Sequence, residues 1–180
     1  MKFGGNEKGA TMVEVIMTLG VIGALGVGIA TLVTSMYDRY RVSRIGAQIE
    51  ELKKTINNRY VADGQYTDIS IATLIDEELA PKDMVNNKKL SHAYKGEVTL
   101  KGSADSYEIT FSDLPQRICV ELGIMNWTVD NTSDLVSLDI NGKDFEWPWV
   151  TGNYKLPAQM ADVSVACKSG SANIIKWTFQ

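Results

Sequence analysis

Few residues of this chain have the type and placement for chemistry, and Glu14 is the most informative of them. It is the only charged residue between Lys8 and Asp38, and it stands at the head of an apolar run. Residues 15–33 read VIMTLGVIGALGVGIATLV, without a charge or a proline. A carboxylate in a membrane segment costs up to about 2.5–3.5 kcal/mol at the bilayer centre, and it usually marks a function and a partner. Glu14 is therefore a candidate functional residue that needs a partner.

The other chemical candidates argue against an enzyme. His92 is the only histidine and lies beside Ser91 in a lysine-rich segment, NNKKLSHAY. A serine hydrolase needs its nucleophile and base together in a pocket, which adjacency in sequence does not provide, so we expect His92 to be a solvated loop residue. The sequence has no Gly-x-Ser-x-Gly motif and no P-loop. We expect no catalytic residue and no cofactor.

Composition excludes two further classes of function. Two cysteines and one histidine are too few for a four-ligand Cys/His zinc cluster, and we expect no metal. The net charge of −4 and the isoelectric point near 5.1 argue against nucleic acid as a partner. The 180 residues suit one domain with an appendage.

The apolar run has the length of a membrane span. About 19 residues of helix extend roughly 28 Å, which matches a bilayer core of about 30 Å. A buried core helix is rarely apolar on every face. A secretory signal peptide would end in a small-residue cleavage site, whereas this run ends TLVTSMYDRYR. The pattern therefore favours a membrane segment.

The N-terminus, with Gly9 followed by ATMVE and a long apolar helix, resembles that of type IV prepilins. The resemblance implies that a prepilin peptidase cuts between Gly9 and Ala10 and methylates the new amine of Ala10. It also implies that Glu14 is the glutamate at the fifth mature position, which acts in assembly. Residues 1–9 would be the leader and residues 10–36 the transmembrane and assembly helix. Lysines before the span and arginines after it leave the orientation undecided, and the resemblance implies that the leader is inside.

The remaining chain predicts an α+β fold. Apolar residues from Val42 to Tyr60 recur every three or four positions, so one long spine helix should run from about residue 11 to about 62, with its first half apolar. Gly64 is a plausible stop. Period-two runs predict a hairpin and two further strands. The spine should be packed by an antiparallel sheet in a globular domain of residues 37–180. The expected strands are 97–101, 107–111, 135–140 and 174–179, and the expected shorter helices are 70–79 and 116–125.

The segments AYKGEVTL and YEITFSDLPQRIC are similar to the type IVb major pilins of conjugative plasmids and enteric pathogens. Ala10 also points to the b class, because the first mature residue of the a class is often phenylalanine. An exported domain favours a disulfide between Cys119 and Cys167 over two free thiols, and pilins have such a C-terminal bridge. It would close a variable, surface-displayed region of residues 119–167. The aromatic run 145–149, FEWPW, would serve packing or subunit contact, with an adhesive surface as the alternative.

These features together predict a structural subunit of a type IV pilus. The resemblance implies that its partners are further copies in a helical homopolymer, prepilin peptidase, the assembly machinery and, before assembly, the inner membrane. The mature filament would lie outside the bacterial cell, for adhesion, aggregation or conjugative contact. The alternatives are a type II secretion pseudopilin, a minor pilin and, from another class, a membrane-anchored enzyme.

Overall fold

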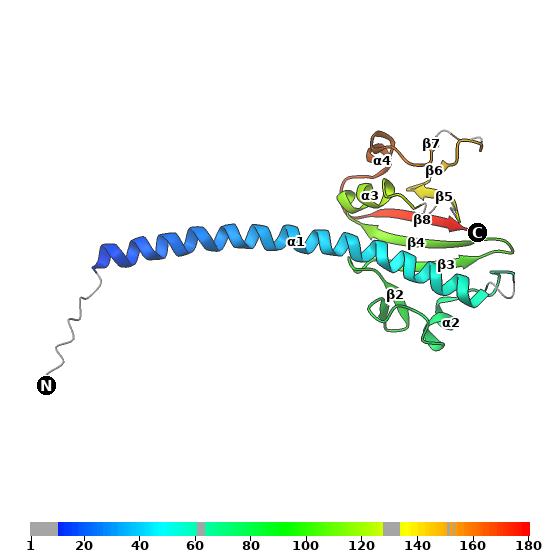
Figure 1. Cartoon of the computed structure of the whole chain (residues 1–180), viewed down its shortest axis with the longest axis horizontal. Coiled ribbons are helices and arrows are strands. Elements are labelled where there is room, and N and C mark those ends of the chain that lie inside the picture. Colours follow the sequence, from blue (N-terminus) through cyan, green and yellow to red (C-terminus); the bar gives the residue numbers. More distant parts are fainter. Residues whose placement is uncertain (1–10, 61–63, 128–133, 151, 153) are drawn as a thin grey trace. The chain divides into compact units, whose positions relative to one another are not determined.

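The computed structural model describes residues 11–60, 64–127, 134–150, 152 and 154–180, with only the backbone described at 25–35 and 38. The chain divides into two compact units, Met1–Tyr40 and Arg41–Gln180. Helix α1, Met12–Tyr60, contributes residues to both (Figure 1). Among the described residues, no helix has both the length and the apolarity of a membrane span.

The second half of α1 packs into the larger unit. The six residues of its predicted stripe are all buried, and Figure 1 shows this part of the helix lying across one face of the sheet. Burying an aliphatic side chain contributes about 1.5–3 kcal/mol, so the stripe is a large part of what holds helix and sheet together. The hydroxyl of Tyr107 adds a polar tie, because it donates to Oδ1 of Asn57 at 2.8 Å. The stripe consists of Val42, Ile45, Ile49, Leu52, Ile56 and Tyr60.

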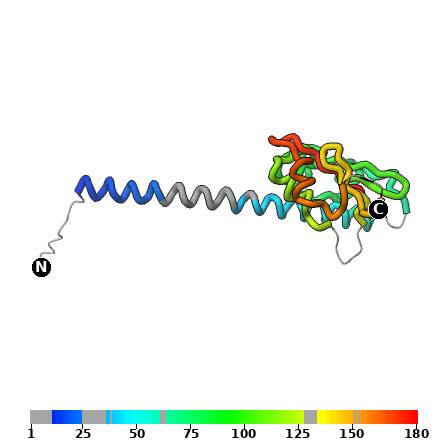
Figure 2. Tube along the Cα trace, turned by 90° about the horizontal axis from the view of Figure 1, so that it is seen from above, coloured from blue at the N-terminus to red at the C-terminus, as the bar shows by residue number. Residues whose placement is uncertain are grey.

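The sheet has eight strands in the order β1-β2-β3-β4-β8-β5-β6-β7. Every neighbouring pair is antiparallel except β6 and β7, which are parallel. The last strand of the chain therefore lies in the middle, and β5, β6 and β7 extend the sheet beyond it. Figure 2 shows the larger unit from above, with the chain through these three strands in yellow to orange and its C-terminal part in red. The strands are β1 (Val85–Asn86), β2 (Lys89–Ser91), β3 (Glu97–Gly102), β4 (Tyr107–Leu114), β5 (Leu135–Ile140), β6 (Lys143–Glu146), β7 (Tyr154–Lys155) and β8 (Asn173–Phe179).

The core is formed by the side chains that alternate between buried and exposed positions along the long strands. In β8, and in β4 as far as Phe111, every second side chain is fully buried, as period-two patterning requires when one face of a sheet is covered. Beyond Phe111 the register of β4 shifts, so that Leu114 is buried as well. Aromatic rings dominate this layer, and Trp177 meets Phe111 edge-on at 5.5 Å. The expected strands are present, and the sheet is larger than the four strands that the sequence predicted.

Three short helices complete the unit. α2, Ile71–Asp76, is capped by Ser70, whose Oγ accepts from the backbone N–H of Thr73 at 3.0 Å. α3 spans Gln116–Gly123. Both are shorter than predicted, and α2 cannot reach residue 79 because Glu78 has a φ of 54°. α4, Met160–Ala166, was not predicted.

Candidate functional site

The first candidate site is the start of α1. Gly9 and Ala10, the predicted cleavage and methylation residues, lie outside the described residues. Glu14 is in the first turn, where its backbone N–H donates to Oγ1 of Thr11 at 3.4 Å, and a negative charge there is favoured by the helix dipole. The side chains around it are apolar and exposed: Met12, Val13, Val15, Ile16, Met17, Leu19, Val21 and Ile22.

The second candidate site is the region between the cysteines. Cys119 in α3 and Cys167, the C-cap of α4, form a disulfide with a Cα–Cα distance of 5.9 Å. The bridge that the sequence predicted is therefore present. Gly123 lets α3 approach its neighbours closely, because a Cβ there would lie 2.6 Å from Val163 Cγ1 and 2.8 Å from Ile140 Cδ1. The disulfide thus joins two helices that are already tightly packed.

A buried amide network holds the Cys167 end of this region in place. Asn173 is fully buried; its Nδ2 donates to the carbonyls of Leu114 and Lys168, both at 3.0 Å. Its Oδ1 accepts from the Lys168 backbone N–H at 2.7 Å and from Nδ2 of Asn141 at 2.8 Å. Asn141 also donates to the carbonyl of Ala166 at 2.8 Å. All four hydrogen bonds that an amide can make are satisfied at Asn173, so β4, β8 and the residue after Cys167 are fixed to one another.

The aromatic run 145–149 is divided between core and surface. Phe145 is buried against Tyr154, with ring centroids 5.0 Å apart. Trp147 is half-buried, and its indole N–H donates to the carbonyl of Leu135 at 2.8 Å. Trp149 is 77% exposed and stacks on Trp147 at 5.3 Å with an interplanar angle of 4°. The predicted packing role therefore holds for the first two, while Trp149 presents one ring face outward.

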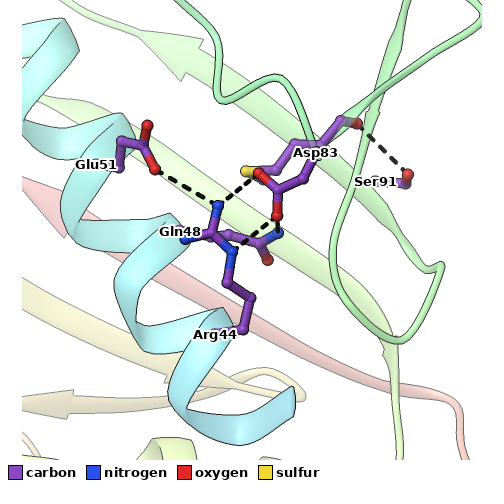
Figure 3. A network of polar contacts seen from close by, with 6 residues as sticks. Arg44, Gln48, Glu51, Asp83 and Ser91 are labelled. Atoms are coloured by element: carbon purple, nitrogen blue, oxygen red, sulfur yellow. Dashed lines mark hydrogen bonds and ion pairs between the residues drawn. The ribbon is translucent and has the colours of Figure 1, made fainter. Parts of the chain in front are cut away.

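A polar cluster fastens the loop before β1 to α1. Figure 3 shows Arg44 and Gln48 reaching from the helix to Asp83. The guanidinium of Arg44 donates to both carboxylate oxygens of Asp83, at 2.8 and 2.6 Å, and Nε2 of Gln48 donates at 2.7 Å. The hydrogen bond from Arg44 is the main reason that the pKa of Asp83 lies below its ordinary value. The carboxylate therefore stabilises the fold above about pH 4, and this contribution is lost as pH falls through the lowered folded pKa.

We expect Asp83→Ala to cost about 1–3 kcal/mol of folding free energy, because it leaves a buried amide without its acceptor. Gln48 is only 1% exposed, and its Oε1 already lacks a partner among the described residues. The ion pair itself is half-exposed and adds little. Thermal unfolding of the full chain in detergent measures the loss. The double variant Gln48→Met/Asp83→Ala should recover part of it, and additive losses would contradict this account.

His92 is buried, which corrects the expectation of a solvated loop residue. It is 3% exposed and stacks on Phe111 at 5.2 Å. The backbone N–H of Tyr94 donates to Nδ1 at 3.1 Å, so Nδ1 is the acceptor and Nε2 carries the proton. Nε2 then donates to the carbonyl of Ser112 at 2.7 Å. Burial lowers the pKa of His92, while the Ser112 carbonyl and the carboxylate of Asp113 oppose this shift.

The geometry offers no metal-binding cluster: across the described parts of the chain, no three His, Cys, Asp or Glu side chains gather as metal ligands would. Sequence reasoning placed His92 in a solvated loop and did not identify Asn173 or the Arg44–Asp83 pair. A local signal existed only for the turn that carries Asn141. Asn-Gly at 141–142 is typical of a two-residue hairpin turn, and both residues have positive φ, 55° and 83°.

Comparison with known proteins identifies a family for most of the chain. A family model described as PilS N terminal matches residues 39–180. No curated protein matches the chain significantly. One similar solved structure is a type IVb pilin from Salmonella typhi, with 16% identity, a TM-score of 0.46, and coverage of 71% of this chain and 96% of that one. Another is TcpA, a type IV pilin from Vibrio cholerae El Tor biotype, with 10% identity, a TM-score of 0.49, and coverage of 78% and 99%.

Proposed function

We propose that this chain, which belongs to the PilS N-terminal family, is a type IV pilin, a structural subunit and not an enzyme. It would build a type IVb filament through the apolar part of α1. The observation that carries the proposal is the exposure of that part of the helix. From Met12 to Ile22 eight large apolar side chains are exposed, and Glu14 is the only charge among them.

Such a helix needs an apolar environment on all sides. Each large side chain gains about 1.5–3 kcal/mol when it leaves water. We propose that the inner membrane supplies this environment before assembly and that neighbouring copies of the helix supply it in the filament. Gly20 and Gly23 support the second step, because in the described part of the chain nothing other than their chain neighbours and the helix's own backbone lies within 4 Å of where their Cβ atoms would be. Small residues let helices approach closely when no water drives them together.

Processing would precede assembly. We propose that a prepilin peptidase removes residues 1–9 and methylates Ala10, and that an assembly machinery then extracts the subunit. The resemblance of GATMVE to the prepilin leader supports this order. The disulfide supports export to an oxidising compartment, where such bridges form and persist. The mature head would then be displayed on the cell surface, with Trp149 available for contacts.

We expect mass spectrometry of purified filaments to give a subunit that begins at a methylated Ala10. Gly9→Val should block the cut, because a β-branched side chain replaces the small residue at the cleavage point. Lys2→Ala is a matched control in the leader that should leave cutting unchanged. Filaments whose subunits keep Met1 would refute the processing step. The absence of any filament that contains the chain would refute the proposed function itself.

A further inference from the structure

The segment that joins β2 to β3 is a small turn closed around one histidine. Residues 92–96, which we call the latch, are held by the backbone N–H of His92 donating to the carbonyl of Gly96 at 3.1 Å. The N–H of Lys95 donates to the carbonyl of His92 at 2.7 Å. The imidazole adds its own two hydrogen bonds, from Tyr94 and to Ser112. The ring of His92 therefore has two roles. It holds the turn of the latch closed through Tyr94, and it joins the latch to β4 through Ser112.

The latch has no room to accommodate a displaced ring. A Cβ on Gly96 would lie 2.1 Å from the carbonyl oxygen of Ser112 and 2.3 Å from Nε2 of His92. One face of the imidazole is stacked on Phe111 with an interplanar angle of 8°. Glycine is thus required for the backbone to approach the ring, and the ring cannot rotate while the latch is closed.

From this geometry we propose that the latch is an acid-sensitive switch: protonation of His92 opens residues 92–96 while the central sheet stays folded. A proton on Nδ1 would face the backbone N–H of Tyr94, so two donors would oppose each other at 3.1 Å. A buried imidazolium also loses most of its hydration. Opening the turn relieves both costs, because the ring then reaches water.

The charged groups around the latch do not offset the cost of protonating His92 in the closed turn. Asp113 is the carboxylate that favours the protonated ring, and it acts against the larger effect of burial, which lowers the pKa of His92. The guanidinium of Arg41 in α1 lies over the ring of Tyr94 at 5.2 Å, so a cation already sits beside the turn. Lys95 is exposed on the latch itself, and Glu97 in β3 is paired with Lys89 in β2 at 3.4 Å.

Opening can stay local because few strand pairings hold the latch on its β2 side. β2 pairs with β3 through only two residue pairs, Leu90 with Val98 and Ser91 with Glu97. β4 pairs with β8 through six. Local unfolding units of this kind open at a lower free energy than the core. Release of the latch would uncover the face of Phe111 that the imidazole covers and remove the contact between Tyr94 and Arg41.

Hydrogen–deuterium exchange of the full chain in detergent, corrected for the intrinsic pH dependence, tests the switch. The peptide spanning residues 90–97 should exchange about tenfold faster for each pH unit below pH 6.5, as long as the closed latch stays unprotonated, because opening takes up one proton. The peptide spanning residues 107–114 should stay protected. The chain has one histidine, so the ring C–H signal in NMR reports protonation of His92 alone.

Two variants make the test decisive. His92→Gln keeps a donor for the Ser112 carbonyl and cannot titrate, so its latch should exchange at a rate that does not depend on pH. Asp113→Asn keeps an acceptor for the hydroxyl of Ser112 and removes the charge that favours a closed, protonated ring. It should match the unmodified protein wherever the closed ring is unprotonated. At lower pH, where exchange in the unmodified protein levels off because its closed ring takes up a proton, exchange in Asp113→Asn should keep accelerating. Equal acceleration in residues 107–114, an unchanged rate at 90–97, or the same pH dependence in His92→Gln would overturn the proposal.

Discussion

Replacing Glu14 by glutamine is expected to leave the subunit processed and inserted, yet to lower the number of surface filaments roughly tenfold or more. In an apolar filament core the carboxylate needs a partner, since an unpaired buried charge is strongly disfavoured. If the helix of the mature subunit continued to residue 10, the amine of Ala10 would be about one helical turn from Glu14, roughly 6 Å along the axis, and the amine of a neighbouring subunit could approach directly. Glutamine keeps the shape and removes the charge that would fix the axial register of an incoming subunit.

Two further variants locate the effect. Glu14→Ala should fail like Glu14→Gln, because the charge is the shared loss. Thr18→Val should assemble normally, since the Thr18 hydroxyl only donates to the carbonyl of Val15 in its own helix, at 2.9 Å. Electron microscopy counts filaments, and immunoblots of membranes measure processed subunit. Filament numbers at the wild-type level with Glu14→Gln would show that Glu14 is merely a polar residue at the membrane interface.

Cys119→Ser should cost about 2–5 kcal/mol of folding free energy and lower the yield of subunit. The bridge closes a loop of 48 residues in sequence separation, which the chain-entropy account values at about 4 kcal/mol. For a chain of this size the loss corresponds to a fall in Tm of roughly 5–20 °C. Because Asn173 holds the end near Cys167 by four hydrogen bonds, the native structure should persist at low temperature. The loss would then arise mainly in the unfolded chain.

Reduction of the unmodified protein provides the matched measurement. Thermal unfolding with and without dithiothreitol should show the same fall in Tm as Cys119→Ser, and the double variant Cys119→Ser/Cys167→Ser should add nothing further. The circular dichroism spectrum at 20 °C should not change. Equal Tm values in the oxidised and reduced protein would contradict the stabilising role of the bridge.

Sequence patterns predicted the elements whose side chains repeat with a clear period. The stripe from Val42 to Tyr60 repeats at helical spacing, and the runs 97–101 and 107–111 alternate, so each was placed correctly. β1, β2 and β7 have two or three residues each, which is too short for a period to appear. They are strands only because a neighbour is available to pair with.

Some features of the candidate sites could likewise be predicted from the sequence, and others could not. A pair of cysteines carries its own chemistry, so the bridge was predictable from residue type. The burial of His92 was not, because its surroundings are supplied by Phe111 and Ser112, some twenty positions further along the chain. The same holds for Arg44 and Asp83, which are 39 residues apart. Contacts of this kind depend on the fold and leave no local pattern. Gly9, Ala10 and Glu14 remain predictions of the N-terminal motif.

The central place of β8 has a consequence for how the subunit comes to be folded. β8 pairs with β4 on one side and with β5 on the other, so until residues 173–179 arrive the two halves of the sheet have no strand between them. During that interval the chain would have two long unpaired strand edges, which are templates for aggregation. Pairings between distant segments also form slowly. The pairing of residues 173–179 thus sets the time at which the head loses these two exposed edges and with them a route to self-association.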